Sequence, residues 1–147
     1  MSNATTLESL SGLLDESLDS IPDAPSYVIP PKGFYKLRVT ADAKDIADKP
    51  ALQLTYEILD TLELVEATDT PVANGGIFNE SFFMDKPEGK SYLKRTLEGV
   101  SAHFGCTTLL QAVEKCQGLE IGGTVKHRNN KNDKDKPYCS VENITVL

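Results

Sequence analysis

The sequence predicts a mainly β domain with one or two helices, preceded by an acidic helical arm. Two observations predict this fold class. Apolar and polar residues alternate in several segments after residue 32, which is typical of strands with one buried face. Within that part of the chain, apolar residues recur at helical spacing only between residues 91 and 118. A length of 147 residues suits one domain with a tail, which we place at residues 32–147 and 1–31.

Residues 1–31 are expected to form an acidic amphipathic arm and a proline-rich linker. Thr5 and Glu8 have the spacing of a capping box, which marks a helix start. The leucines that follow recur at helical spacing: Leu7, Leu10, Leu14 and Leu18. Proline breaks helices and restricts the residue before it, so the linker is expected to be extended around its four prolines, Pro22, Pro25, Pro30 and Pro31.

Three strands are predicted in the first half of the domain. Gly33–Ala41 and Ala51–Asp60 alternate strictly, and the charged connection between them, residues 42–50, is expected to be a hairpin loop. Their core faces carry Tyr35, Leu37 and Val39, and then Leu52, Leu54, Tyr56 and Ile58. The third strand, Ile77–Met84, follows a strong turn signal of asparagine and two glycines.

The second half of the domain is predicted to hold the helices and two more strands. The first helix should begin with Ser91 as its cap and end at Gly105, because its apolar residues follow helical spacing: Leu93, Leu97, Val100 and Phe104. A short second helix should run from a cap at Thr107 or Thr108 to Gly118. The last strands are Leu119–Arg128 and Tyr138–Leu147, with a basic, asparagine-rich hairpin loop between them.

The resulting order, β-β-β-α-β-β, is that of a five-stranded OB-fold barrel, which is small and partly open. Gly122 and Gly123 in the fourth strand would permit the sharp bend that a small barrel needs. The helix also falls where an OB-fold uses one to close the bottom of its barrel. A β-sandwich with appended helices is the alternative.

The net charge of −7 is unevenly distributed. Residues 1–31 hold five acids and no base, whereas residues 126–136 hold five Lys or Arg residues against two acids. Local charge decides which surface an anionic polymer can touch, so the negative total does not exclude nucleic acid. The chain has no apolar run of transmembrane length, no basic signal region at its N-terminus and an odd number of cysteines. We therefore expect a cytoplasmic protein without disulfides or a membrane partner.

Signals for catalysis and for metal binding are weak. The sequence has no glycine-rich phosphate loop, nucleophile elbow or paired-histidine motif. His103 and Cys106 could form a nucleophile–base pair, but nothing marks a third, orienting residue. Together with Cys116 and either His127 or Cys139 they could bind zinc, although structural zinc normally uses two closely spaced pairs. We expect no enzyme activity, cofactor or metal, and we interpret the cysteines as buried free thiols.

A nucleic-acid interface needs cations that follow the phosphates and flat rings on which bases stack. The outer face of the first strand offers one ring and two cations in a row: Phe34, Lys36 and Arg38. Five cations and one ring surround the loop between the last two strands: Lys126, Arg128, Lys131, Lys134, Lys136 and Tyr138. Phe83 is expected on the outer face of the third strand. The alternative is a solvated loop, with rings that enter the core if the register slips by one residue.

These segments together resemble the small OB-fold single-stranded DNA-binding proteins of bacteriophages and prophages. The resemblance covers residues 32–147 and lies in the order of elements and in one layout: a helix ending in FG, then G-x-x-I-G, then a basic loop ending in KPY. It implies sequence-independent binding of single strands during replication or recombination, in the host cytoplasm. Many replication single-strand binders carry an acidic C-terminal tail and groove tryptophans, whereas this chain ends in ENITVL and has no tryptophan.

Two other function classes stay open. One is an acidic protein-binding module, such as an inhibitor of a host DNA-binding enzyme, which the net charge favours and the basic loop opposes. The other is an enzyme or metal protein that uses His103 and Cys106. The arm also has two interpretations: its leucines pack on the domain, or its acids compete with DNA or recruit replication or recombination proteins. Homo-oligomerisation is left open.

Overall fold

The structure is a computed structural model that describes residues 5–21, 26–130 and 135–147. The described residues form a mainly β protein with five strands and four α-helices. The α-helices are α1 Leu7–Leu14, α2 Pro87–Thr96, α3 Glu98–Phe104 and α4 Leu109–Cys116, and a short 3-10 helix spans Leu18–Ser20. The strands are β1 Gly33–Ile46, β2 Lys49–Leu64, β3 Ile77–Phe83, β4 Leu119–Arg128 and β5 Tyr138–Val146.

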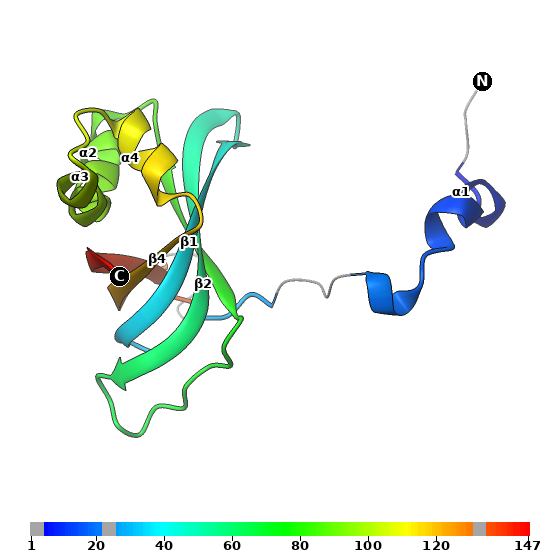
Figure 1. The fold of residues 1–147 in the computed structure, drawn as a ribbon, viewed down its shortest axis with the longest axis horizontal. Helices are drawn as coiled ribbons and strands as arrows, with labels where there is room; N and C mark the ends of the chain where they lie inside the picture. The colour runs from blue at the N-terminus through cyan, green and yellow to red at the C-terminus, as the bar shows by residue number, and fades with distance from the viewer. Residues whose placement is uncertain (1–4, 22–25, 131–134) are drawn as a thin grey trace.

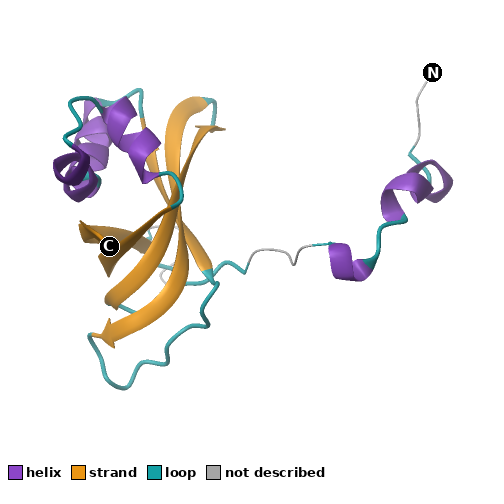
Figure 2. Ribbon diagram, in the orientation of Figure 1, coloured by secondary structure: helices purple, strands orange, loops and turns teal. Residues whose placement is uncertain are grey.

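The five strands form one antiparallel sheet in the order β3-β2-β1-β4-β5, with β1 at its centre (Figure 1). Figure 2 shows α2, α3 and α4 gathered at one end of the sheet. The edge strands approach each other, because the backbone N–H of Val141 on β5 donates to Oε1 of Glu80 on β3 at 3.4 Å. The described residues form no backbone ladder between β3 and β5, and we call this open line between the two strands the seam.

Alternation along β1 and β2 builds the core, as predicted. The fully buried side chains of these strands are Tyr35, Leu37, Val39, Leu54, Tyr56 and Ile58. Burying a large apolar side chain contributes roughly 1.5–3 kcal/mol, so this inner face contributes much of the stability of the sheet. Its register leaves Phe34, Lys36 and Arg38 on the outer face of β1, where the sequence places them.

The connection between β1 and β2 differs from the prediction of a charged loop over residues 42–50. Both strands continue beyond the core and meet at a two-residue turn. Ala47 and Asp48 have φ of 51° and 62°, and positive φ at both positions is what a type I′ hairpin turn requires. The charged side chains of this extension are exposed, so backbone pairing alone makes it a strand.

The stretch predicted as one helix over residues 91–105 contains two, α2 and α3, which meet at Leu97. The domain therefore has three helices where one or two were expected. α2 begins at Pro87, which suits the first turn of a helix, and not with Ser91 as its cap. Ser91 lies inside α2 and donates its hydroxyl to the Pro87 carbonyl at 3.0 Å. Gly99 brings α3 against β5, because a Cβ there would meet the carbonyl oxygen of Ile144.

The predicted ends of α3 and α4 are confirmed in part. Gly105 ends α3 in the left-handed conformation, with φ of 66°. Thr108 caps α4, since its Oγ1 accepts from the backbone N–H of Gln111 at 3.2 Å. α4 ends at Cys116, and Gly118 follows with φ of 70°.

α1 is the helix expected in the arm, with a different cap. Thr6 forms the capping box with Ser9, in place of Thr5 with Glu8. No residue of α1 is buried, and its leucine stripe is not packed on the sheet: Leu7 is 81% exposed and Leu14 63%. Figure 1 shows α1 standing apart from the strands.

The end of the linker is attached to the sheet. The backbone N–H of Val28 donates to the Ile77 carbonyl at 2.9 Å, which ties the linker to the beginning of β3. The hydroxyl of Tyr35 donates to the Pro31 carbonyl at 2.6 Å. No helix among the described residues is long and apolar enough to cross a membrane.

Candidate nucleic-acid interface

The structure divides the predicted binding residues between two surfaces. One set lies on the outer face of β1 and β4: Phe34, Lys36, Arg38 and Lys126. A second set lines a cleft at the seam: Phe83, Arg128 and Tyr138. Lys136 is exposed two residues before Tyr138, while Lys131 and Lys134 lie outside the described residues. The sequence did not distinguish these two surfaces.

Every predicted cation on the outer face has a carboxylate opposite it on a neighbouring strand. The ion pairs are Lys36 Nζ–Glu120 Oε1 at 3.5 Å, Arg38 NH1–Glu57 Oε1 at 3.3 Å and Lys126 Nζ–Glu142 Oε2 at 2.8 Å. Exposed pairs of this kind contribute about 0–1 kcal/mol to stability. Their larger effect is on the electric field, because the outer face presents alternating charges and gives an approaching phosphate little net attraction.

Phe34, the ring of this outer face, has a structural role. A Cβ on Gly122 of the neighbouring β4 would lie 3.2 Å from Cζ of Phe34, so the ring covers the glycine. An aromatic ring laid over a glycine shields backbone that would otherwise be open to water. Phe34 keeps 38% of its surface exposed, but part of its face is already occupied.

The cleft at the seam has a volume of about 720 Å³ and is bounded by β3, β5, the first two turns of α2 and the tip of the β1–β2 hairpin. Its walls combine rings, cations, carboxylates and neutral polar groups, namely Phe82, Phe83, Tyr92 and Tyr138, then Lys86 and Arg128, then Glu80 and Glu88, then Asn79, Ser81 and Ser140. The alternation of side chains along β3 explains how this strand lines the cleft. Phe82 is 5% exposed and packs in the core, which turns Phe83 outward. Arg128 and Tyr138 are paired in register at the two ends of the β4–β5 loop.

Two arginines lie close to one ring of this cleft, that of Tyr92. The guanidinium carbon of Arg95 lies 5.3 Å from the centroid of the Tyr92 ring, and that of Arg128 lies 5.6 Å from the same centroid. Tyr92 and Arg95 are three residues apart on α2 and so share one helix face. Among the described residues neither arginine forms an ion pair, unlike the cations of the outer face.

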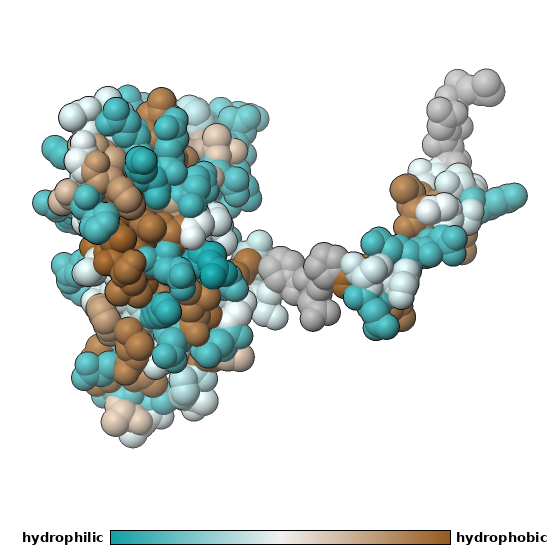
Figure 3. Space-filling model, in the orientation of Figure 1, coloured by the Kyte–Doolittle hydropathy of each residue, from teal (hydrophilic) through white to brown (hydrophobic). Residues whose placement is uncertain are grey.

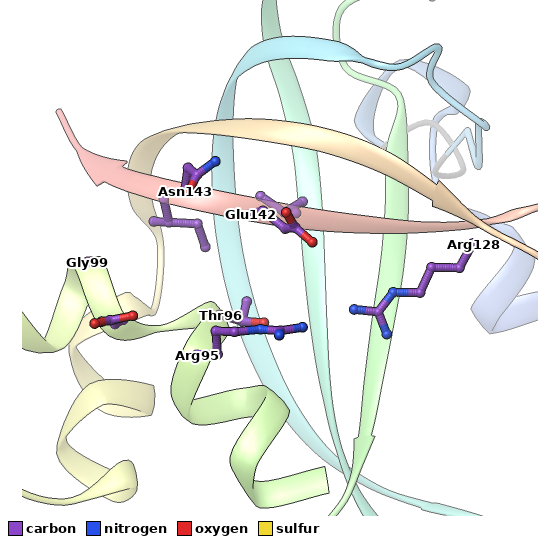
Figure 4. A pocket seen from close by; sticks show the side chains of 9 residues that line it. Arg95, Thr96, Gly99, Arg128, Glu142 and Asn143 are labelled. Carbon is purple, nitrogen blue, oxygen red and sulfur yellow. The ribbon is translucent and has the colours of Figure 1, made fainter. Parts of the chain in front are cut away.

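A second hollow, of about 370 Å³, opens between α2, α3 and β5 on the other side of Arg128. Figure 4 shows the side chains of Arg95 and Arg128 pointing toward each other across it, with Glu142 on β5 nearby. The hydrogen bond from Lys126 lowers the pKa of Glu142, and the charges of Arg95 and Arg128 add to this effect. Arg128 thus lines both hollows, and each hollow also has two carboxylates in its lining: Glu80 and Glu88 in the cleft, and Glu98 and Glu142 in the smaller hollow.

No family model, curated protein or solved structure matches this chain.

Glu80 lies at the floor of the cleft and links three strands. Its Oε1 accepts from the hydroxyl of Tyr56 on β2 at 3.3 Å and from the backbone N–H of Val141 on β5 at 3.4 Å. Burial raises the pKa of Glu80 to about 7, although the Val141 N–H, the charge of Arg128 and the Tyr56 hydroxyl all act to lower it. The floor of the cleft therefore gains negative charge as the pH rises through neutrality.

The histidine and cysteine candidates lie away from the seam cleft, apart from Cys139 in its wall. Burial raises the pKa of Cys116 and of Cys139 to about 11, so both remain protonated thiols at neutral pH. His103 makes an edge contact with the neighbouring Phe104, and His127 Nε2 lies 2.7 Å from the Pro30 carbonyl oxygen. Within the described ranges, no three His, Cys, Asp or Glu side chains are grouped as metal ligands would be.

Sequence reasoning missed three residues of the seam: Lys86, Tyr92 and Arg95. All three precede or belong to α2, and the apolar stripe of this helix predicts only its buried side. The signal that could have found two of them is the spacing of Tyr92 and Arg95. A ring and a cation three residues apart share one helix face, and this pair lies on the polar side of the helix.

Proposed function

We propose that the protein is a non-catalytic, largely sequence-independent single-stranded DNA-binding protein, built as an OB-fold barrel that is open at the seam. Such proteins serve DNA replication or recombination, and the resemblance to bacteriophage proteins makes that setting the natural one. The strand order β3-β2-β1-β4-β5, with β5 beside β3, supports this assignment of the fold.

The position of the cleft supports the proposal. OB-folds bind oligonucleotides over strands two and three, between the loop that joins strands one and two and the loop that joins strands four and five. The seam cleft is lined by β3 but not by β2, it has Ile46 from the first of these connections at one side, and Arg128 and Tyr138 flank the second.

The observation that supports the proposal most directly is the grouping of two rings, Tyr138 and Phe83, with Arg128 in one cleft. Stacking on a ring contributes roughly 1–3 kcal/mol per base, and it tolerates any sequence because every base has a flat face. Arg95 and Arg128, which form no ion pair with another described residue, supply the charge for phosphates. A duplex buries the flat faces of its bases in its own stack, so the seam favours single strands.

A pair of arginine variants tests this proposal. We expect Arg128→Ala to weaken binding of a labelled single-stranded oligonucleotide roughly 10-fold or more, since a charged hydrogen bond to phosphate contributes about 1.5–3 kcal/mol. Arg38→Ala removes the same side chain from the outer face, where Glu57 already neutralises it, and should change affinity by less than about twofold. Fluorescence anisotropy measures the dissociation constant of each variant for the oligonucleotide. Equal losses in the two variants would show that the outer face also contacts DNA, and no loss in either would contradict the proposal.

A second function, binding of a partner protein through the acidic arm, is favoured by one observation. The arm exposes Leu7, Leu14 and Leu18, and all of its charged residues are acidic. Binding through the arm does not involve the seam. If it is the protein's function, Arg128→Ala should leave binding of the partner protein unchanged.

A further inference from the structure

One carboxyl group of the seam cleft has no cation of its own. Glu80 lines the floor of the cleft, and its Oε1 accepts from the Tyr56 hydroxyl and from the backbone N–H of Val141. Among the described residues no Lys or Arg forms an ion pair with Glu80, whereas three acids of the outer face each have one. A carboxylate held mainly by uncharged donors in a partly buried site is sensitive to any further charge that enters that site.

The cation nearest in role to a partner is Arg128, which is also the cation expected to hold a phosphate. Arg128 lines the same cleft as Glu80, and its charge acts on Glu80 from β4. A phosphate held by Arg128 brings a second negative charge into the cleft. Like charges that share a partly buried site disfavour each other's ionised form, so a bound strand raises the pKa of Glu80. Linkage makes the effect reciprocal, since protonation of Glu80 removes this repulsion and strengthens the binding of phosphate.

We propose that binding of a single strand at the seam is coupled to protonation of Glu80, so that the protein takes up a proton as it binds and holds the strand more tightly below neutral pH than above it. This inference rests on the proposed function, because it needs a strand at the seam, and it adds regulation by pH to that function. Burial raises the pKa of Glu80 to about 7 in the free protein, which places the change in affinity near neutral pH.

Other titratable and charged groups face Glu80 or line its cleft. Among the described residues they are Tyr56 on β2, Arg128 on β4, Tyr138, Cys139 and Glu142 on β5, and Lys86, Glu88 and Tyr92 at the beginning and in the first turns of α2.

Three of these neighbours have shifted pKa values that keep their charge constant near neutral pH. Burial raises the pKa of Tyr56 well above its usual value and that of Cys139 to about 11, and the hydrogen bond from Lys126 lowers the pKa of Glu142. The acids of the arm are not among the neighbours, because no residue of α1 is buried and Figure 3 shows the arm apart from the surface of the domain. A change of binding across neutral pH therefore points to Glu80.

Oligonucleotide binding by the full chain at constant ionic strength tests the coupling. The wild type should lose affinity for a labelled oligothymidylate roughly 3–10-fold between pH 6 and pH 8.5, because each unit by which the strand raises the pKa of Glu80 changes the affinity by at most tenfold. Glu80→Gln should keep, at both pH values, the affinity that the wild type has at pH 6. Glu88→Gln is the matched control, since it removes the same charge from an exposed position of the same cleft. It should bind more tightly than the wild type and keep the wild-type pH dependence.

Tyr56→Phe locates the titrating group. This variant keeps the Glu80 carboxyl and removes the hydroxyl that donates to it, and that hydrogen bond acts to lower the pKa of Glu80. The loss of affinity should therefore move to higher pH in Tyr56→Phe. Calorimetry in two buffers with different ionisation enthalpies measures the proton itself. At pH 7 the wild type should take up part of one proton for each strand bound, and Glu80→Gln should take up none.

The possible results separate this inference from the proposed function. If the wild type binds equally tightly at pH 6 and pH 8.5, or if Glu80→Gln takes up as much proton as the wild type, the coupling is wrong and the proposed function stands. Absence of binding at both pH values would overturn the two together. Thermal melting checks that the variants fold. If Glu80→Gln does not fold, Tyr56→Phe decides, and an affinity loss centred at the same pH as in the wild type would overturn the inference.

Discussion

Tyr138 and Phe34 are both partly exposed rings, but their surroundings give them different roles. Tyr138 is 55% exposed at the mouth of the seam cleft, whereas Phe34 covers Gly122 on the outer face. A free ring can stack on a base, and a ring that covers a glycine stabilises the sheet.

The two rings therefore make opposite predictions when removed. Tyr138→Ala should weaken single-strand binding by roughly 1–3 kcal/mol and leave its salt dependence unchanged, because stacking involves no counterion release. Phe34→Ala should leave the affinity nearly unchanged and lower the free energy of unfolding. Oligonucleotide titrations and urea unfolding of both variants check this. A stable Phe34→Ala protein with weakened binding would show that the outer face contacts DNA.

Glu80 should make stability depend on pH. Its pKa is about 7 in the folded protein against 4.5 for an ordinary Glu, so the folded state binds the proton more tightly than the unfolded state. The resulting stabilisation is fully present below about pH 4.5 and is lost as the pH rises through 7, with a total on the order of 3 kcal/mol.

Glu80→Gln should abolish this dependence, because the amide carries no titrating proton and keeps an oxygen for Val141 and Tyr56. Urea unfolding at pH 5 and at pH 8 measures the effect in both proteins. If the wild type loses no more stability than Glu80→Gln between these pH values, then Glu80 is ionised in the folded protein at pH 5.

At the scale of the elements, the packing of α3 on β5 depends on Gly99. A Cβ at this position would meet the Ile144 carbonyl oxygen, which is backbone and cannot move aside as a side chain could. Gly99→Ala should therefore lower the free energy of unfolding by about 1–3 kcal/mol, the usual effect of overpacking. Gly12→Ala in the exposed α1 is the matched control and should not lower it. A Gly99→Ala protein as stable as the wild type would mean that α3 can shift along β5 without loss.

Elements with a strong apolar period were predictable from sequence, and their ends were less so. β1 and β2 were predicted because burial imposes strict alternation on residues such as Tyr35 and Leu37. The hairpin beyond Ala41 was not, since most of its side chains are exposed and backbone pairing leaves no pattern in the sequence. The division of the long helix at Leu97 was missed for a related reason: Leu93, Leu97 and Val100 are all buried, so one continuous stripe spans two helices.

At the scale of the whole molecule, strand register and the meeting of distant elements explain why only part of the lining of the seam cleft was predicted from the sequence. Ring and cation types can be read from a sequence, and Arg128 and Tyr138 were identified in this way. Which cation faces an acid depends on strand register, and the pairing of Arg38 with Glu57 follows from a register that alternation alone does not determine. The seam itself forms from β3, β5 and α2, which are far apart in the chain.

Salt dependence of single-strand binding tests the proposed function most directly. Three cations at the seam form no ion pair in the described structure: Lys86, Arg95 and Arg128. Each phosphate neutralised on a single strand contributes about −0.7 to the slope of log affinity against log salt concentration. The wild-type protein should bind a labelled single-stranded oligonucleotide with a slope of log affinity against log salt near −2. It should bind the matching duplex much more weakly at every salt concentration. Equal affinity for duplex and single strand, or no binding of either at low salt, would contradict a single-strand site at the seam.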